Sequence, residues 1–279
     1  MILVICFWKY PTTNIQQRKT NFMKLAYREF GEGQPLIILH GLFGQSDNWN
    51  TLAKRFGENG FKVYTLDQRN HGLSMHSDAW DYQLMAEDLK EFIEEHHLQN
   101  VILLGHSMGG KTVLFFEQMF PQLANKLIIV DISPRAYEPH HDSVLKALNA
   151  VDFTDINTRK EAEAILGEYI LDFGTKQFLL KNIFWKEDET KQMAWRFNLK
   201  TITREYNNVG VGVPYFYSDT ETLFIRGEKS DYIADNDMQD IASRFSNYQL
   251  KTIVNSGHWV HAEQPEAFFN CVMNFISKF

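Results

Sequence analysis

Short apolar runs alternate with longer amphipathic stretches along most of this chain, and each run stops at or near a glycine, histidine or aspartate. The runs have the length of buried β-strands and lie at 35–39, 61–66, 101–104, 127–130, 223–225 and 250–254. Residues 82–96 and 108–120 have the pattern of helices. Strands that alternate with helices indicate βαβ units, and uninterrupted apolar runs are typical of strands covered on both faces. We therefore predict an α/β fold with a mostly parallel, doubly wound sheet.

The alternation stops between residues 135 and 215. This stretch is charged and rich in aromatic residues, it has helical character, and it holds no apolar run of strand length. We predict that residues 135–215 form a helical insertion in one α/β domain, placed where it covers the edge of the sheet. The sheet domain then consists of residues 23–134 and 216–279. The alternative is that the stretch only adds a few helices that pack against the sheet.

The first eight residues form an unbroken apolar run, and residues 9–21 are polar without periodicity. The run is too short to cross a bilayer, which takes about 20 residues. It also lacks the basic start and the small-residue cleavage site of a secretory signal. We predict that residues 1–22 are an N-terminal extension outside the fold. An interfacial membrane anchor is the functional alternative.

Composition argues against several classes of protein. The chain of 279 residues has a formal net charge of −7 at pH 7, which is not the charge of a nucleic-acid-binding protein. Its two cysteines, Cys6 and Cys271, lie near opposite ends and suit a reducing compartment, so we expect a cytoplasmic protein. Neither a phosphate-binding glycine loop nor a metal-ligand spacing stands out, so we expect no cofactor and no metal. We also expect no stable membrane anchor, and a monomer or weak homodimer.

The segment GHSMG at residues 105–109 contains the pattern G-x-S-x-G directly between a predicted strand and a predicted helix. A serine on such a sharp strand-to-helix turn is the exposed nucleophile of many acyl-transfer enzymes. The turn is strained, and Gly105 and Gly109 supply the room that it needs. The sequence therefore predicts Ser107 as a catalytic nucleophile.

A serine hydroxyl of ordinary acidity needs a general base. Of the 10 histidines, His258 is the best placed, because it follows the last predicted strand and so reaches the same carboxyl edge of the sheet as Ser107. The chain order of serine, acid and histidine also fits this kind of fold. We expect His140 and His141 to lie on the solvated surface of the insertion. Structural roles are expected for His40, His71, His106 and His261.

Acyl transfer also needs N–H donors that stabilise the oxyanion of the transition state. We expect one from the backbone of Met108, directly after the nucleophile, and the second from the loop that follows residues 35–39. We assign the second donor to the Leu42 amide, with the Phe43 amide as the alternative. The segment 67–72 follows another strand at the same edge, and we expect it to shape the pocket.

These motifs give the chain from about Met23 to Phe279 a resemblance to α/β-hydrolase-fold serine esterases. More narrowly, it resembles the bacterial YbfF-type esterases and the related mitochondrial abhydrolase-domain proteins. The narrower resemblance rests on the segments HGLFG (40–44), RNHGLS (69–74), GHSMGGK (105–111), WRFN (195–198) and GHWVHAE (257–263). It implies an α/β-hydrolase fold with an inserted helical cap over the site, and hydrolysis of small acyl esters that extends to acyl-CoA thioesters.

The acid of the triad departs from the commonest pattern of this fold. Most such hydrolases place an aspartate three residues after the glycine that ends the strand near 223–226. Here that glycine is Gly227, Ser230 occupies the third position, and Asp231 comes one residue later. Some α/β hydrolases carry the acid after an earlier strand, and YbfF-type esterases resemble this arrangement, which corresponds to Asp131. We prefer Asp131 and keep Asp231 as the alternative; Asp131 could also simply bind nearby turn amides.

The sequence thus predicts a cofactor-free serine esterase with Ser107, His258 and Asp131 as its catalytic residues. Leu42 and Met108 form its oxyanion hole. The expected substrate is a small-molecule acyl ester or thioester, cleaved through an acyl-enzyme intermediate. Two alternatives stay open: a C–C bond hydrolase with the same triad, and a catalytically silent binding protein of this fold.

Overall fold

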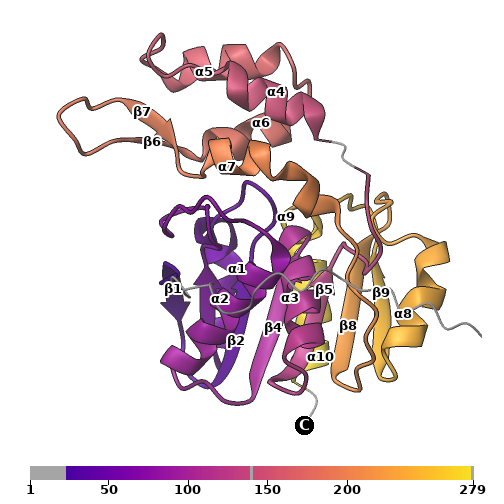
Figure 1. Cartoon of the computed structure of the whole chain (residues 1–279). Coiled ribbons are helices and arrows are strands. Elements are labelled where there is room, and N and C mark those ends of the chain that lie inside the picture. Colours follow the sequence, from indigo (N-terminus) through magenta and orange to yellow (C-terminus); the bar gives the residue numbers. More distant parts are fainter. Residues whose placement is uncertain (1–22, 139–140, 278–279) are drawn as a thin grey trace, which may run out of the picture.

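A computed structural model describes residues 23–138 and 141–277 of the chain (Figure 1). Within these residues, seven strands form one sheet in the order β1-β3-β2-β4-β5-β8-β9. Neighbouring strands run parallel except β1 and β3, which are antiparallel. The strands are β1 (Tyr27–Phe30), β2 (Gln34–Leu39), β3 (Phe61–Leu66), β4 (Val101–His106), β5 (Ala124–Val130), β8 (Glu221–Gly227) and β9 (Tyr248–Ile253).

The centre of the sheet consists of the apolar runs seen in the sequence. β4 lies between β2 and β5, with Leu104 opposite Ile38 on one side and Ile128 on the other. All six residues of β4 are buried. Because successive side chains of a strand point to opposite faces, Leu103 and Leu104 pack into different apolar clusters. Both faces of the sheet are therefore covered, as the sequence predicts.

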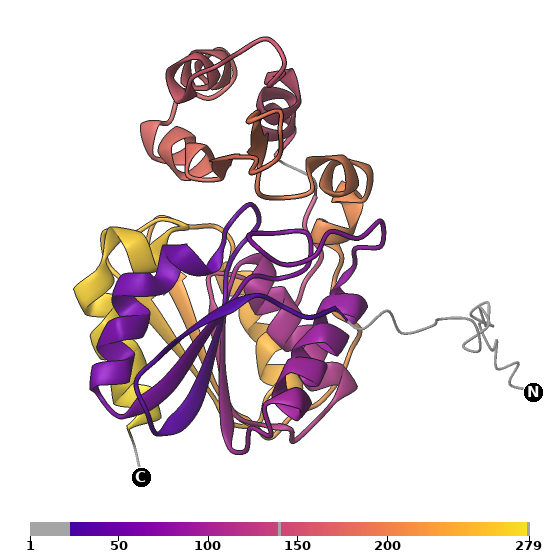
Figure 2. The same cartoon turned by 90° about the vertical axis from the view of Figure 1, so that its left-hand side faces the viewer.

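Helices form a layer on each face of the sheet (Figure 2). On one face the two helices contact each other through aromatic side chains, as in the stacking of Phe56 on Phe269 at a centroid distance of 5.0 Å. The helices of that face are α1 (Asn50–Glu58) and α10 (Pro265–Ile276), and those of the other face are α2 (Tyr82–Glu95), α3 (Met108–Met119) and α8 (Met238–Arg244). The predicted α/β, doubly wound architecture is confirmed.

Between β5 and β8 the chain leaves the sheet and builds a separate layer above one end of the strands (Figures 1 and 2). We call residues 135–215 the cap. Its described elements are α4 (Asp142–Ala150), α5 (Arg159–Gly167), α6 (Phe173–Leu180), β6 (Ile183–Trp185), β7 (Met193–Trp195), α7 (Leu199–Arg204) and the 3-10 helix η3 (Tyr206–Gly210). The sequence predicts the helical character of the cap but not the antiparallel pair β6 and β7, because three residues are too few to form a recognisable strand pattern.

The structure differs from the sequence prediction in two further places. Residues 23–28 alternate between apolar and polar side chains, a pattern that predicts a strand there, whereas β1 begins at Tyr27 and ends at Phe30. Leu25 is nevertheless buried in the core beside α2. Helix α1 is not predicted, because its buried face consists of only three apolar residues. Short helices complete the described elements: η2 (Ser46–Trp49), η4 (Asp235–Asp237) and α9 (Val260–Glu263).

None of the helices within residues 23–138 and 141–277 has the length and apolar character needed to cross a membrane. The predicted extension, residues 1–22, lies outside the described residues.

Candidate active site

Ser107 occupies a strained turn between β4 and α3. Its backbone dihedrals are φ 54° and ψ −115°, in a region that non-glycine residues rarely adopt. The Ser107 amide donates to the carbonyl of Val130 on the neighbouring strand at 2.9 Å. A Cβ on Gly105 would lie 2.2 Å from the carbonyl oxygen of Gly109, so the turn closes only with glycine there. The backbone therefore has the strand-turn-helix geometry expected of a nucleophile elbow.

Asp131 follows β5, which pairs with β4 as predicted for consecutive parallel strands. The residue is fully buried and has φ 52°. Its amide donates to the carbonyl of Ile225 on β8 at 2.7 Å. The carboxylate is thus placed at the carboxyl end of the sheet, one strand away from Ser107.

The Asp131 carboxylate contacts the predicted base. Its Oδ2 lies 2.7 Å from Nδ1 of His258 and also accepts a hydrogen bond from the Ser230 hydroxyl. Its Oδ1 accepts from the Gly227 amide at 3.0 Å. Because a carboxylate oxygen accepts hydrogen bonds, Nδ1 of His258 is the donor in this contact and Nε2 is left without a proton. Asp231, in contrast, is exposed, and its main-chain oxygen accepts from Arg135.

Tyr232 packs against the His258 ring, and His106 contacts the main chain of His258. The two stacked rings of Tyr232 and His258 have a centroid distance of 3.9 Å and an interplanar angle of 20°. His106, next to Ser107, lies with its Nε2 2.8 Å from the His258 carbonyl oxygen. The Ser107 hydroxyl makes no hydrogen bond within residues 23–138 and 141–277. In such sites the hydrogen bond between serine and histidine often forms fully only when substrate is bound.

The loop after β2 lies against the nucleophile. A Cβ built on Gly41 would be 3.3 Å from Cβ of Ser107. The Leu42 amide has no acceptor among the described residues, whereas the Phe43 amide donates to Nε2 of His71 at 3.2 Å. Met108 is the first residue of α3, where backbone N–H groups have no partner within the helix. The geometry therefore favours Leu42 over the alternative Phe43 as the second donor.

Burial favours the neutral form of the four histidines for which the sequence predicts structural roles. Burial lowers the pKa of His40 to about 4 and the pKa values of His71 and His261 to about 3. Burial also lowers the pKa of His106 well below its ordinary value. His40 accepts a hydrogen bond from the Gln68 amide at Nε2, 3.0 Å away, and His261 stacks on Trp49. These contacts agree with the structural roles expected from the sequence.

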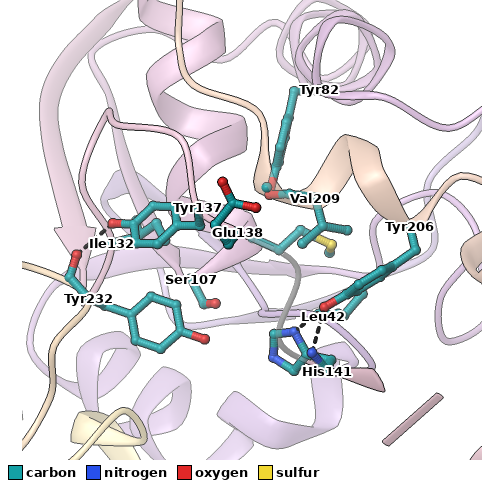
Figure 3. Close-up of a pocket in the computed structure, with 12 residues that line it drawn as sticks. Leu42, Tyr82, Ser107, Ile132, Tyr137, Glu138, His141, Tyr206, Val209 and Tyr232 are labelled. Atoms are coloured by element: carbon teal, nitrogen blue, oxygen red, sulfur yellow. Dashed lines mark hydrogen bonds between the residues drawn. The ribbon is translucent and has the colours of Figure 1, made fainter. Parts of the chain in front are cut away.

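A pocket opens above Ser107 between the sheet domain and the cap (Figure 3). Leu42, Met108 and Tyr232 line it from the sheet domain. His141 and Tyr206 line it from the cap and hydrogen-bond to each other, with Nδ1 of His141 2.6 Å from the tyrosine hydroxyl. The expectation that His141 is solvated surface is therefore wrong, because folding of the cap brings it to the pocket. His140 lies outside the described residues.

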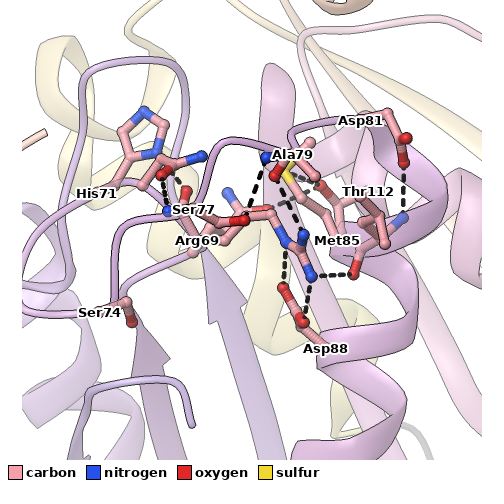
Figure 4. A network of polar contacts seen from close by, with 12 residues as sticks. Arg69, His71, Ser74, Ser77, Ala79, Asp81, Met85, Asp88 and Thr112 are labelled. Carbon is pink, nitrogen blue, oxygen red and sulfur yellow. Dashed lines mark hydrogen bonds and ion pairs between the residues drawn. The ribbon is translucent and has the colours of Figure 1, made fainter. Parts of the chain in front are cut away.

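A polar network fixes the loop after β3 (Figure 4). The Arg69 guanidinium binds the Asp88 carboxylate of α2 through two hydrogen bonds, both 2.6 Å long. The Asp67 carboxylate accepts from the amides of Ser46, at 2.5 Å, and Leu73, at 2.9 Å. Both carboxylates therefore already have main-chain or ion-pair partners. These contacts fix the conformation of the loop, which agrees with a loop that shapes the pocket.

Lys111 connects α3 to both ends of the cap. Its side chain is buried, and Nζ donates to the carbonyl oxygens of Pro134, at 3.2 Å, Arg135, at 2.5 Å, and Val211, at 2.8 Å. Burial and the charge of Arg135 lower the pKa of this ammonium group to about 7. The lysine thus joins the segments where the chain enters and leaves the cap.

The sequence predicts where Ser107 and His258 lie. It does not indicate which residues support the Asp131 carboxylate and pack on the His258 ring. Tyr232 and Ser230 lie just after β8, and the only signal for Ser230 was its position where this fold usually has its acid. The His141–Tyr206 pair and the role of Lys111 depend on contacts between distant segments, so no local pattern indicates them.

Comparison with known proteins places this geometry in a family. Residues 34–164 match the family model of the alpha/beta hydrolase fold. The chain is 34% identical over 263 residues to "Esterase YbfF" of Escherichia coli, covering 93% of this chain and 99% of that protein. It is also 34% identical over 271 residues to "sn-1-specific diacylglycerol lipase ABHD11" of Danio rerio, covering 93% and 84%.

A solved structure gives the same result. A marine microorganism esterase superimposes with a TM-score of 0.86 at 40% identity, covering 91% of this chain and 99% of that one. Sequence relatives and structure therefore agree on both the fold and the class of enzyme. The chain belongs to the α/β-hydrolase family and is one of its esterase-type hydrolases.

Proposed function

We propose that this enzyme cleaves carboxylic esters through a catalytic triad of Ser107, His258 and Asp131. The observation that carries the proposal is the 2.7 Å contact between Asp131 and Nδ1 of His258 beside the strained turn of Ser107. The acid holds the ring in the tautomer whose Nε2 is basic, so the imidazole can accept the serine proton. Asp231 is exposed and takes no part.

Acylation begins with attack of the Ser107 oxygen on the acyl carbonyl carbon, while His258 Nε2 takes the hydroxyl proton. The buried Asp131 carboxylate stabilises the imidazolium that forms. The amides of Leu42 and Met108 stabilise the oxyanion, and each such donor typically contributes about 2.7–4 kcal/mol in the transition state. His258 then returns the proton to the leaving alcohol, which departs and leaves an acyl-enzyme.

Deacylation repeats the cycle with water as the nucleophile, activated by His258, and releases the carboxylic acid. Acyl-CoA thioesters are a second substrate class for the same machinery, because a thiolate leaves more readily than an alkoxide. The cap, residues 135–215, covers the pocket and supplies aromatic side chains such as Tyr206 for acyl chains to pack on.

We place the protein in the cytoplasm, because its two cysteines suit a reducing compartment.

A substrate panel tests this function. Purified protein is assayed with p-nitrophenyl esters of increasing acyl length, acyl-CoA thioesters and a diacylglycerol, the last because relatives are named diacylglycerol lipases. We expect turnover of esters by the wild type and none by Ser107→Ala, with the two proteins equally folded by circular dichroism. A wild type that cleaves no member of the panel would indicate a silent binding protein instead.

A further inference from the structure

One side chain of the cap reaches the turn that carries the Leu42 amide. Asn182 lies between α6 and β6 and is 1% exposed. Its Nδ2 donates to the carbonyl oxygen of Phe43 at 2.9 Å. Phe43 belongs to the turn Gly41–Gly44, which is closed by a 2.9 Å hydrogen bond from the Gly44 amide to the Gly41 carbonyl. Asn182 is therefore a direct polar link between the cap and this turn.

The turn needs such restraint because of its backbone conformation. Phe43 has φ 59°, in the left-handed region that a side chain disfavours. Without a restraint at Phe43, relaxation of this φ toward negative values would shift the backbone of the whole turn, including the Leu42 amide that precedes it. His71 holds the Phe43 amide at 3.2 Å and Asn182 holds its carbonyl at 2.9 Å. The two contacts stabilise the conformation seen here.

The Asn182 side chain acts through its donor. Nδ2 also lies 3.3 Å from the Phe178 carbonyl, so two carbonyl oxygens face the same nitrogen. Exchanging the amide oxygen and nitrogen would place three acceptors together, which excludes the opposite orientation. The Oδ1 atom is buried and has no hydrogen-bond partner among the described residues. A buried amide with an unpaired oxygen is costly, so a purely packing role would favour an apolar residue.

Asn182 is itself fixed within the cap. The main-chain N–H of Asn182 donates to the Leu179 carbonyl at 3.0 Å, and its main-chain carbonyl accepts from the Arg196 amide at 2.8 Å. Phe197 of the same layer packs on the Phe43 ring at a centroid distance of 5.0 Å. Movement of the cap would therefore withdraw both contacts from the turn at once.

We propose that Asn182 is a positioning residue that couples the seating of the cap to the geometry of the oxyanion hole. With the cap seated, Asn182 holds the Phe43 carbonyl and the Leu42 amide faces the acyl oxygen. With the cap displaced, the turn loses this restraint and the enzyme loses transition-state stabilisation. The inference rests on the proposed function, because it takes the Leu42 amide as an oxyanion donor.

The test compares Asn182→Ala and Asn182→Asp with the wild type. Asn149→Ala is the matched control, because Asn149 also donates to a helix carbonyl in the cap, that of Leu145, but binds only within the cap. We measure kcat, KM for a short-chain p-nitrophenyl ester, and Tm. Removing an oxyanion donor outright lowers kcat by about 10²–10³, and we expect displacing one to lower kcat roughly 10- to 100-fold, with KM nearly unchanged. Tm should fall in both variants at pH 8, because the buried Phe43 carbonyl loses its donor. Asn149→Ala should match the wild type.

The pH dependence of the aspartate variant separates a donor role from packing. A carboxylate cannot donate to the Phe43 carbonyl, but the neutral acid can. The ratio of kcat for Asn182→Asp to kcat for the wild type should therefore rise as the pH falls from 8 to 5, while the ratio for Asn182→Ala stays constant.

Two results would overturn the proposal. The first is a kcat within about twofold of the wild type in both variants. The second is a loss of kcat that is equal in both variants and does not change with pH, which would mean that Asn182 only packs the cap. Failure of the proposed function is distinguishable, since it would appear as an inactive wild type or an active Ser107→Ala.

Discussion

Asp131 receives three hydrogen bonds, two from the end of β8 and the turn that follows it, and one from His258. The Gly227 amide, the Ser230 hydroxyl and Nδ1 of His258 all surround its carboxylate. Ser230 stands where this fold most often carries its acid, and here its hydroxyl supports a carboxylate from the neighbouring strand. A carboxylate therefore contacts the histidine as in other hydrolases of this fold, although here it follows β5 and not β8.

Asp131→Asn should lower kcat far more than Asp231→Asn. Asparagine has nearly the shape of aspartate but cannot hold His258 in the required tautomer or offset its positive charge, and this change typically lowers turnover about 10⁴-fold. Steady-state kinetics on the same ester measures both variants. Asp231→Asn serves as the matched control, because its carboxylate is exposed and should be dispensable. Loss of activity in Asp231→Asn, with most of the rate retained in Asp131→Asn, would reverse the assignment.

Single residues differ in how well the sequence predicts them. Ser107 and His258 lie in segments whose local pattern already indicates their position at the carboxyl edge of the sheet. The choice between Asp131 and Asp231 depends on which loop reaches the histidine, and the residue pattern alone leaves that open. Tyr232 and Asn182 act through contacts with distant segments, so their roles appear only in the folded chain.

At the scale of elements, long apolar runs were predictable and short elements were not. The six apolar runs correspond to β2, β3, β4, β5, β8 and β9. Burial on both faces requires apolar residues throughout a strand, which makes the central strand β4 conspicuous. β9 lies at the edge of the sheet and is only partly buried, so its run is interrupted by polar residues. β6 and β7 are three residues each and are stabilised by pairing within the cap, a tertiary effect that leaves little trace in the sequence.

Lys111 should make stability depend on pH through the junction of α3 with the cap. Its pKa in the folded protein is about 7, below the value of about 10.4 for an exposed lysine. Between these values the unfolded chain binds more protons than the folded one, so the free energy of unfolding rises with pH. Relative to that of Lys111→Met, the free energy of unfolding of the wild type should increase by up to about 1 kcal/mol per pH unit from pH 7.5 to 9.

Denaturant unfolding at several pH values measures this difference. Lys146→Met, at an exposed position on α4, is the control and should show no such trend. A difference between the wild type and Lys111→Met that stays constant with pH would mean that the three carbonyl oxygens keep the ammonium group protonated throughout.

At the scale of the whole molecule, the sheet domain and the cap meet over the pocket of Ser107. The contacts across this junction include those of Lys111 and Asn182, and a hydrogen bond from the Asn198 amide to the Asn70 carbonyl. The sequence indicates where the insertion begins and ends, because the strand pattern stops and resumes. It does not indicate how the cap sits, since that follows from contacts between residues more than 100 positions apart, such as Asn182 and Phe43.

Deleting residues 1–21 should leave Tm and esterase activity nearly unchanged. The polar stretch 9–21 separates the apolar start of the chain from Met23, where the described domain begins. Differential scanning calorimetry and an ester assay on the shortened and full chains measure the effect. A fall in Tm of more than several degrees would mean that the first residues pack on the domain.

The central claim is that Ser107 is the nucleophile of a serine hydrolase, and covalent labelling tests it most directly. The full chain is treated with a fluorophosphonate, and the adduct is located by peptide mass spectrometry. We expect one adduct, on Ser107, formed in parallel with the loss of ester hydrolysis, and no adduct in Ser107→Ala. Labelling elsewhere with Ser107 unmodified, or hydrolysis that survives in Ser107→Ala, would contradict it.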